Sequence, residues 1–247
     1  MISGTCQTFL SFIKICLTTL NYKSYIFFSH EGKKVRRPLP SWFFLERRME
    51  DLRDYFDRHA SSWDEMLKYN ERTSELLEVV SWFGLAEGYW VLDVGTGTGI
   101  LSPSIRQAIG PKGMIIGFDF SFKMLEKAKL REYFGEKIFL TATAESIPLR
   151  SALFDRIICF SAFPHFTDKA KALVEMVRVL KSGGVLFIAH LKSVEELNQF
   201  HRHLGGPVAH DLLPHPERVR SLMKESGLCD VSIINQPGKF LAQGEKI

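Results

Sequence analysis

The stretch that decides the fold is residues 91–100, which read Val91-Leu92-Asp93-Val94-Gly95-Thr96-Gly97-Thr98-Gly99-Ile100. An apolar run ends abruptly in three glycines at alternate positions, and apolar residues then return at helical spacing. This pattern predicts a buried strand, a tight turn and the start of a helix. Glycine suits such a turn because it accepts positive φ angles and lets a ligand lie against the backbone. Unpaired N–H groups at the helix start would face the polar end of that ligand.

The spacing of the glycines narrows the class of ligand. In the dinucleotide fingerprint G-x-G-x-x-G, the third glycine stands six positions into the motif, and Ile100 occupies that place here. The third glycine comes one residue earlier, at Gly99, and Asp93 lies inside the strand end just before the turn. A nicotinamide-dependent oxidoreductase is therefore the weaker interpretation of this motif.

Four further segments follow at regular intervals. Residues 114–119 form a second short apolar strand that ends in Asp119, twenty positions after Gly99, where a carboxylate can bind ribose hydroxyls. Ser121 is placed to cap the helix that follows. The remaining segments are a loop at 143–149, a strand at 154–160, and a Leu-Lys-Ser-Gly-Gly turn at 180–184 that leads into another strand.

In order and composition, these five motifs resemble those of the class I S-adenosylmethionine-dependent methyltransferases, over about residues 51–247. Their style is similar to that of the ubiquinone/menaquinone-type small-molecule enzymes. The resemblance implies that S-adenosyl-L-methionine is the cofactor. It places in the cofactor site Asp93, Gly95, Thr96, Gly97, Gly99, Asp119, Phe120, Ala144, Glu145 and Phe160. Two positions depart from the family pattern, since Thr143 replaces an Asp and Phe160 replaces a frequent Asn.

The alternation of strands and helices predicts an α/β fold, a doubly wound Rossmann-like sheet that is mainly parallel. A hairpin over about residues 231–242 is expected to close the sheet with an antiparallel strand. Residues 49–247 form the expected methyltransferase domain. Within it we expect a helical lid at 49–85, a cofactor-binding core at 86–191, and a substrate-side insertion with the closing strands at 192–247.

Residues 1–48 differ from the rest of the chain in charge and pattern. They hold eight Lys or Arg and two Glu, whereas residues 49–247 hold 24 basic and 26 acidic residues. No helix or strand period persists through residues 21–48. The favoured interpretation is an atypical extension that arises from the choice of start site, with Met49 as the natural start. The alternative is a basic arm for a membrane surface or a partner.

Composition excludes several classes of partner. The slightly acidic body offers no broad basic face, so nucleic acid is not expected as a partner. No apolar run reaches the roughly 20 residues that a membrane span requires. The four cysteines, Cys6, Cys16, Cys159 and Cys229, show no C-x-x-C spacing, which argues against a disulfide framework and favours the reducing cytoplasm. The oligomeric state stays open.

Histidines gather late in the sequence. His165 follows the strand at 154–160 and is the candidate general base, with packing at a strand–helix turn as the structural alternative. His201, His203 and His210 could suggest a metal site, but the first two lie two positions apart on an expected helix and so face different sides. We therefore expect no metal site, and a loop that shapes the substrate pocket.

The expected substrate is a small apolar or aromatic molecule. Methyl transfer needs an aligned nucleophile, exclusion of water and, for hydroxyl or carbon nucleophiles, removal of a proton. Apolar, mostly aromatic residues are expected to line the pocket mouth, namely Phe160, Phe163, Pro164 and Phe166, and Phe56 and Trp63 are expected to close it from the lid. A non-catalytic S-adenosylmethionine-binding sensor stays open, because the cofactor motifs alone permit it.

Overall fold

The computed structural model describes residues 25–30, 33–38 and 41–247, with side chains described from Glu46 onwards. Contacts within the chain define two compact units, Met1–Phe44 and Leu45–Ile247. In the first unit, strands β1 (Tyr25–His30) and β2 (Lys33–Pro38) pair antiparallel. Cys6, Cys16 and the apolar stretch at 8–20 lie outside the described residues.

Although no helix or strand period marks residues 21–48 in the sequence, the structure has regular elements there. Besides β1 and β2, helix α1 (Ser41–His59) begins eight residues before the expected boundary at Met49. Residues 25–28 are aromatic or β-branched and favour a strand by side-chain type, without any apolar alternation that a period search would detect.

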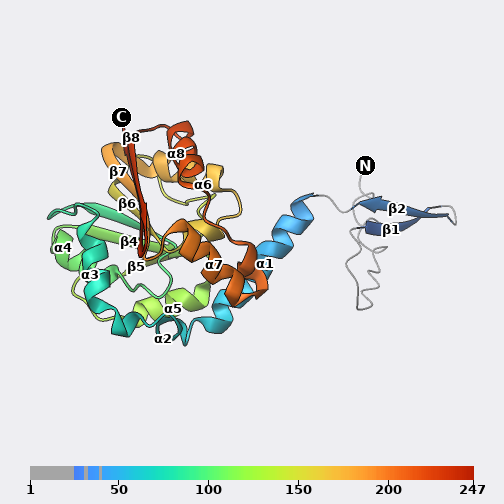
Figure 1. Ribbon diagram of the computed structural model, residues 1–247, viewed down its shortest axis with the longest axis horizontal. Helices are drawn as coiled ribbons and strands as arrows, with labels where there is room; N and C mark the ends of the chain where they lie inside the picture. The colour runs from blue at the N-terminus through green and yellow to red at the C-terminus, as the bar shows by residue number, and fades with distance from the viewer. Residues whose placement is uncertain (1–24, 31–32, 39–40) are drawn as a thin grey trace, which may run out of the picture. The chain divides into compact units, whose positions relative to one another are not determined.

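The second unit is built on a seven-stranded sheet (Figure 1). Its strands are β3 (Trp90–Val94), β4 (Met114–Asp119), β5 (Ile138–Thr141), β6 (Phe154–Phe160), β7 (Leu180–His190), β8 (Leu228–Gln236) and β9 (Lys239–Lys246). Their order is β5-β4-β3-β6-β7-β9-β8. The first five in this order are parallel, and β9 is antiparallel to β7 and β8, which confirms the doubly wound, mainly parallel sheet with a closing hairpin.

The helices cover both faces of the sheet. They are α2 (Trp63–Met66), α3 (Thr73–Ser81), α4 (Ser102–Ile109), α5 (Phe122–Leu130), α6 (Lys169–Val179), α7 (Val194–Leu204) and α8 (Pro216–Glu225), with short 3₁₀ turns η1 (Tyr69–Glu71), η2 (Phe163–His165) and η3 (Gly206–His210). Helices α3 and α4 lie on one side, and α6 and α8 on the other (Figure 1).

Alternate residues of the central strands build the two cores. Ile157 of β6 packs into the cluster that contains α6 and α8, whereas its neighbour Ile158 packs into the cluster that contains α3 and α4. Both are fully buried. Successive strand side chains point to opposite faces, so a sheet covered on both sides needs the near-continuous apolar runs that this sequence carries.

Two element boundaries differ from the sequence expectation. Helix α4 begins at Ser102 rather than directly within the glycine turn, because Gly97 and Gly99 both have positive φ angles that a right-handed helix cannot use. Strand β7 begins at Leu180 rather than at Val185, because Leu180 already pairs with Phe154 before a register shift in β6.

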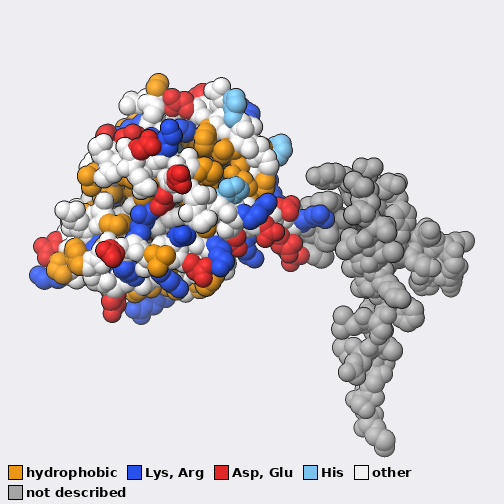
Figure 2. Space-filling view, turned by 90° about the horizontal axis from the view of Figure 1, so that it is seen from below, with side chains coloured by type: hydrophobic (Ala, Val, Ile, Leu, Met, Phe, Trp, Pro, Cys, Tyr) orange, Lys and Arg blue, Asp and Glu red, His pale blue; other side chains and the backbone are white. Residues whose placement is uncertain are grey.

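No helix among the described residues is long and apolar enough to cross a membrane. On the face shown in Figure 2, Lys and Arg side chains are interspersed with Asp and Glu. This mixture agrees with the near balance of basic and acidic residues in 49–247.

Candidate functional site

A cavity of about 440 Å³ lies at the carboxyl ends of the parallel strands. Side chains at or beside the last residues of four strands line it, namely Asp93, Asp119, Phe160 and His190. The chain order reverses direction at β3, and open α/β sheets bind ligands at such a reversal. The volume falls in the range of small-molecule and cofactor sites.

The structure brings together most of the site residues expected from sequence. The cavity is lined by Asp93, Gly95, Thr96, Gly97, Asp119, Phe120, Ala144, Glu145, Phe160 and His165. Gly99 is the exception, since it is not among the lining residues. Of the expected apolar wall, Phe56, Trp63, Phe160 and Phe166 line the cavity, whereas Phe163 and Pro164 are buried and do not line it.

Gly95 and Gly99 have no room for a side chain, and the neighbouring atoms that exclude it differ between the two. A Cβ atom on Gly95 would lie 2.5 Å from the Cβ of Ala162, a closer approach than two carbon atoms allow. A Cβ on Gly99 would lie 3.1 Å from the Cβ of Ala128 on α5. Gly99 therefore serves helix packing, while Gly95 lets the turn pass directly beside the end of β6.

The side chain of Asp93 stabilises the glycine turn by a hydrogen bond. The hydroxyl of Thr96 donates a 2.6 Å hydrogen bond to Asp93 Oδ2, and the Thr96 N–H bonds the carbonyl of Phe118. Burial raises the pKa of Asp93 to about 6, and the Thr96 hydrogen bond opposes this shift. The carboxyl group thus fixes the turn that follows β3.

Asp119 joins the glycine turn to α5. Its Oδ2 accepts the N–H of Gly97 at 2.9 Å, and its Oδ1 accepts the N–H of Ser121 at 2.8 Å. Burial raises the pKa of Asp119 to about 6, against the effect of these two hydrogen bonds. Each carboxylate oxygen has a second lone pair, so Asp119 can still accept hydroxyl protons from a molecule in the cavity. We call Asp93, Gly95, Thr96, Gly97 and Asp119 the glycine-turn group.

The loop after β5 is tied to the segment that carries His165. Oε1 of Glu145 accepts the N–H of Thr167 at 2.9 Å and that of Asp168 at 3.2 Å. The neighbouring Ala144 is buried and lines the cavity. Glu145 therefore uses one oxygen to fix the loop and keeps the other for further contacts.

The first helices close over the cavity. The ring of Phe56 on α1 contacts those of Trp63, Phe120 and His165 edge to face, at centroid distances of 5.1–5.5 Å. Asp64 on α2 accepts the Thr98 hydroxyl and pairs with Arg131 beyond α5. Helix α2 is thus bonded directly to the glycine turn, whereas α1 packs on Phe120 and His165.

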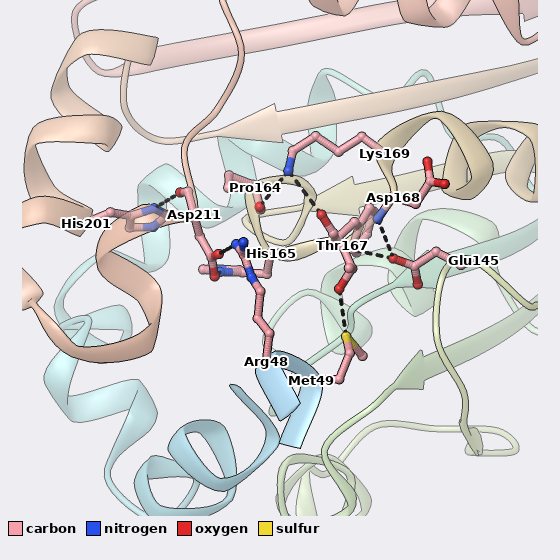
Figure 3. A network of polar contacts seen from close by, with 11 residues as sticks. Arg48, Met49, Glu145, Pro164, His165, Thr167, Asp168, Lys169, His201 and Asp211 are labelled. Carbon is pink, nitrogen blue, oxygen red and sulfur yellow. Dashed lines mark hydrogen bonds and ion pairs between the residues drawn. The ribbon is translucent and has the colours of Figure 1, made fainter. Parts of the chain in front are cut away.

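A group of polar side chains lies across the cavity wall around Asp211 (Figure 3). His165 Nδ1 lies 2.8 Å from Asp211 Oδ2, and Arg48 donates to Asp211 Oδ1. His201 Nδ1 bonds the backbone carbonyl of Asp211. The main chain at His165 is itself fixed, because Lys169 Nζ donates to the carbonyls of Pro164 and Phe166.

His190 completes this wall from the end of β7. It is 1% exposed and lines the cavity, and neither ring nitrogen has a hydrogen-bond partner within the described residues. Burial, helped by the positive charge that His165 and His201 can carry, lowers the pKa of His190 to about 3. His190 is therefore neutral at physiological pH and has an unused acceptor. We call His165, His190, His201 and Asp211 the histidine group.

Sequence reasoning missed His190, Asp211, Arg48 and Tyr69 as site residues. His190 carried a usable signal, since it ends a parallel strand, where ligands bind in such sheets. Tyr69 lines the cavity, and burial raises its pKa to about 12. Arg48 and Asp211 lie 163 positions apart, and nothing local in the sequence relates them.

The histidine-rich segment after β7 shapes the cavity. His201 on α7 is buried, whereas His203 is exposed, as their spacing on a helix predicted. Within the described part of the chain, no group of three or more His, Cys, Asp or Glu side chains could hold a metal ion. His201 instead lines the cavity beside Phe200 and Leu204.

Comparisons with known proteins agree with this geometry. Residues 92–188 match the family described as "Methyltransferase domain". The chain is 32% identical over 185 residues to the ubiquinone/menaquinone biosynthesis C-methyltransferase of Vibrio vulnificus, covering 64% of this chain and 71% of that protein.

Solved structures show the same architecture. A SAM-dependent methyltransferase from Aquifex aeolicus is 26% identical with a TM-score of 0.57, covering 70% of this chain and 89% of that one. A Thermotoga maritima protein described as a SAM-dependent methyltransferase, possible histamine N-methyltransferase, is 20% identical with a TM-score of 0.64. The match covers 78% of this chain and 98% of that one. The latter shows the fold alone. With its motifs, sheet order and relatives in agreement, the chain belongs to the class I S-adenosylmethionine-dependent methyltransferases.

Proposed function

We propose that this methyltransferase transfers the methyl group of S-adenosylmethionine to a small aromatic acceptor with an ionisable hydroxyl group, such as a phenol or a quinol, and that His165 takes the acceptor's proton. The observation that carries the proposal is the composition of the cavity wall. Phe56, Phe160, Phe166 and Phe200 provide aromatic surface, and His165 and His190 provide imidazoles. Such a wall favours a flat apolar molecule with few polar groups.

The glycine-turn group fits the cofactor. A Cβ on Gly97 would meet nothing within 4 Å, so this side of the turn is open to a ligand, and the adjacent Asp119 carboxylate can accept ribose hydroxyls. Thr96, Phe120, Ala144, Glu145 and Phe160 would complete the site. When bound, S-adenosylmethionine supplies a methyl group already activated by the positive charge on sulfur.

The residues of this chain would then prepare the acceptor. His165 removes a hydroxyl proton, which raises the electron density on the oxygen and on the ring carbons next to it. His190 can accept a hydrogen bond from a second hydroxyl group. The Vibrio relative is named a C-methyltransferase, which favours a ring carbon as the atom that is methylated. If a ring carbon is methylated, its new bond to the methyl group would form as the bond from that group to sulfur breaks and S-adenosylhomocysteine leaves. The C–H proton of that carbon would then pass to water and the oxygen would regain its proton from His165, which restores aromaticity.

Amines are the competing class of acceptor, and the cavity wall weighs against them. Cation binding favours carboxylates near the methyl position. Of the carboxylates that line the cavity, Asp93 and Asp119 are hydrogen-bonded within the glycine turn, and Glu145 is hydrogen-bonded to the segment after His165. Neither the nicotinamide-dependent oxidoreductase nor the non-catalytic sensor is favoured by the relatives.

The experiment separates cofactor binding from proton transfer. The protein is incubated with methyl-labelled S-adenosylmethionine and panels of phenols, hydroquinols and amines, and mass spectrometry and NMR locate the methyl group. Asp119→Ala should weaken binding of S-adenosylhomocysteine by about 1.5–3 kcal/mol in calorimetry. His165→Asn should leave this affinity unchanged and lower kcat by about 10²–10⁴-fold.

Matched controls are exposed residues of the same type, Asp54 on α1 and His203 on α7. Asp54→Ala and His203→Asn should match the unaltered protein in both assays. Methylation of amines alone would contradict the proposed acceptor. Full turnover in His165→Asn would contradict the role of His165.

A further inference from the structure

We infer that Asp211 is a positioning residue, which holds His165 in the tautomer that leaves Nε2 unprotonated, and that Arg48 fixes the orientation of the Asp211 carboxylate. The inference rests on the proposed function, in which His165 takes a proton from the acceptor. Figure 3 shows the side chains of Arg48 and His165 meeting at the carboxylate of Asp211.

The tautomer follows from the chemistry of the partners. Asp211 is fully buried, and burial opposes its ionisation, but the hydrogen bonds and charges of His165 and Arg48 outweigh this effect and lower its pKa. An ionised carboxylate only accepts hydrogen bonds, so at 2.8 Å the Nδ1 of His165 must be the donor. Nε2 then carries the lone pair, and His165 lines the cavity.

Arg48 determines which way the carboxylate faces. Its guanidinium donates to Oδ1 while His165 donates to Oδ2, so each oxygen has its own donor. The main chain at Asp211 is also held, because its N–H bonds the carbonyl of Val208 and its carbonyl accepts from His201. The carboxylate therefore has little freedom to rotate away from His165.

A purely structural ion pair would not need this arrangement. Neither Asp211 nor Arg48 lines the cavity, whereas His165 does. Of the two side-chain partners of the Asp211 carboxylate, only His165 lines the cavity, so an effect of this carboxylate on the acceptor passes through the His165 ring. Lys169 is the other cation near Asp211, and it is occupied by two backbone carbonyls.

Replacing Asp211 by Asn gives a sharp test, because an amide has one acceptor and one donor end. Arg48 only donates, so the Asn oxygen should turn toward Arg48 and its NH₂ group toward His165. Nδ1 of His165 must then accept, and the proton moves to Nε2. The tautomer should reverse although the shape of the side chain is unchanged.

The measurement is a long-range ¹⁵N–¹H NMR spectrum of the full chain labelled at histidine, at about pH 8.5, roughly two units above the ordinary imidazole pKa. His165→Asn assigns the His165 signals by their loss. We expect the Nδ1–H pattern in the unaltered protein and the Nε2–H pattern in Asp211→Asn. His201 is the internal control, because its backbone acceptor remains and its Nδ1–H pattern should persist.

A double variant tests the contribution of Arg48 to the His165 tautomer. In the double variant Asp211→Asn with Arg48→Gln, the amide at position 48 can donate or accept a hydrogen bond. The amide oxygen at position 211 is then no longer forced to face position 48. The His165 tautomer should therefore return at least partly to Nδ1–H. An Nε2–H pattern in the unaltered protein would overturn the inference without any variant. An unchanged pattern in Asp211→Asn would also overturn it, and complete reversal in the double variant would overturn the role of Arg48.

Turnover separates this inference from the proposed function. With the best aromatic acceptor from the panel, Asp211→Asn should lower kcat by about 10²–10⁴-fold and leave KM for S-adenosylmethionine within about threefold. Full activity in Asp211→Asn beside an inactive His165→Asn would overturn the positioning role alone. Full activity in His165→Asn would remove the base assignment, whatever the tautomer.

Discussion

The glycine-turn group and the three histidines of the histidine group line the same cavity, but the two groups are built in opposite ways. The glycine-turn group comes from two consecutive strands, and backbone N–H groups make its main hydrogen bonds. The histidine group is held by side chains from distant segments, with 46 positions between His165 and Asp211 and 163 between Arg48 and Asp211. Local backbone geometry fixes the first, and tertiary packing fixes the second.

The difference follows from the tasks proposed for the two groups. A cofactor shared across a family can be held by one backbone arrangement, which a short motif encodes. An acceptor specific to one enzyme needs side chains placed by its own lid and insertion, here α1 and the segment from α7 to Asp211. Each prediction below disturbs one group and leaves the other as its reference.

The largest effect on stability is expected in the glycine-turn group. Gly95→Ala adds a Cβ 2.5 Å from Ala162 at a φ of +68°, and should lower the free energy of unfolding by about 3 kcal/mol through strain and overpacking. Gly97→Ala is the matched control, because Gly97 also has a positive φ of +54° but a Cβ there would meet nothing within 4 Å. This variant should lower the free energy of unfolding by only about 1 kcal/mol. Urea unfolding measures both. Equal losses would show that steric contact at Gly95 does not matter.

The next effect is a dependence on pH that has opposite sign in the two groups. His190 has a pKa of about 3 in the folded protein and an ordinary value of 6.5, so between these values the unfolded chain binds more protons and acid destabilises the fold. Acidification from pH 7.5 to 5 should cost about 2 kcal/mol through His190. Asp93 and Asp119 have folded pKa values of about 6 against 3.8, so they stabilise the fold as pH falls from 6 toward 3.8.

Variants separate these two contributions. Relative to the unaltered protein, His190→Phe should gain about 2 kcal/mol of stability between pH 7.5 and 5, as measured by urea unfolding at each pH. Asp93→Asn should change in the opposite direction over the lower part of this range. A pH-independent difference for His190→Phe would mean that water reaches the ring and the imidazole titrates normally.

The smallest effect concerns the start of the domain. A protein that begins at Leu45, behind an added Met, keeps Arg48, whereas one that begins at Met49 loses it. Both should fold and bind S-adenosylhomocysteine with equal affinity, because the glycine-turn group is intact in each. The Met49 protein should be less stable by up to about 1 kcal/mol, since the Arg48 side chain is 43% exposed and its ion pair is screened by solvent.

Arg48→Gln in the full chain is the control for this truncation. It should reproduce the loss seen in the Met49 protein if the Arg48–Asp211 pair is the cause. A loss of several kcal/mol in the Met49 protein alone would assign residues 45–48 to the folding core of the domain.

The sequence alone determined the sheet and the glycine-turn group. Apolar runs that end in glycine or acid mark β3 and β4, and a turn of three alternate glycines between a strand and a helix has few possible shapes. The family resemblance then predicted ten cofactor-site residues, of which all but Gly99 line the cavity. The roles of these residues in binding remain predictions.

Only the tertiary structure decided the histidine group. His165 was recognisable from its place after β6, but its partner Asp211 was not, because a pairing over 46 positions leaves no periodic trace in the sequence. Arg48 lies on the far side of the boundary expected at Met49, in the part of α1 that precedes the expected helical lid. Side chains brought together by packing depend on the whole fold, whereas a backbone turn depends on the few residues that form it.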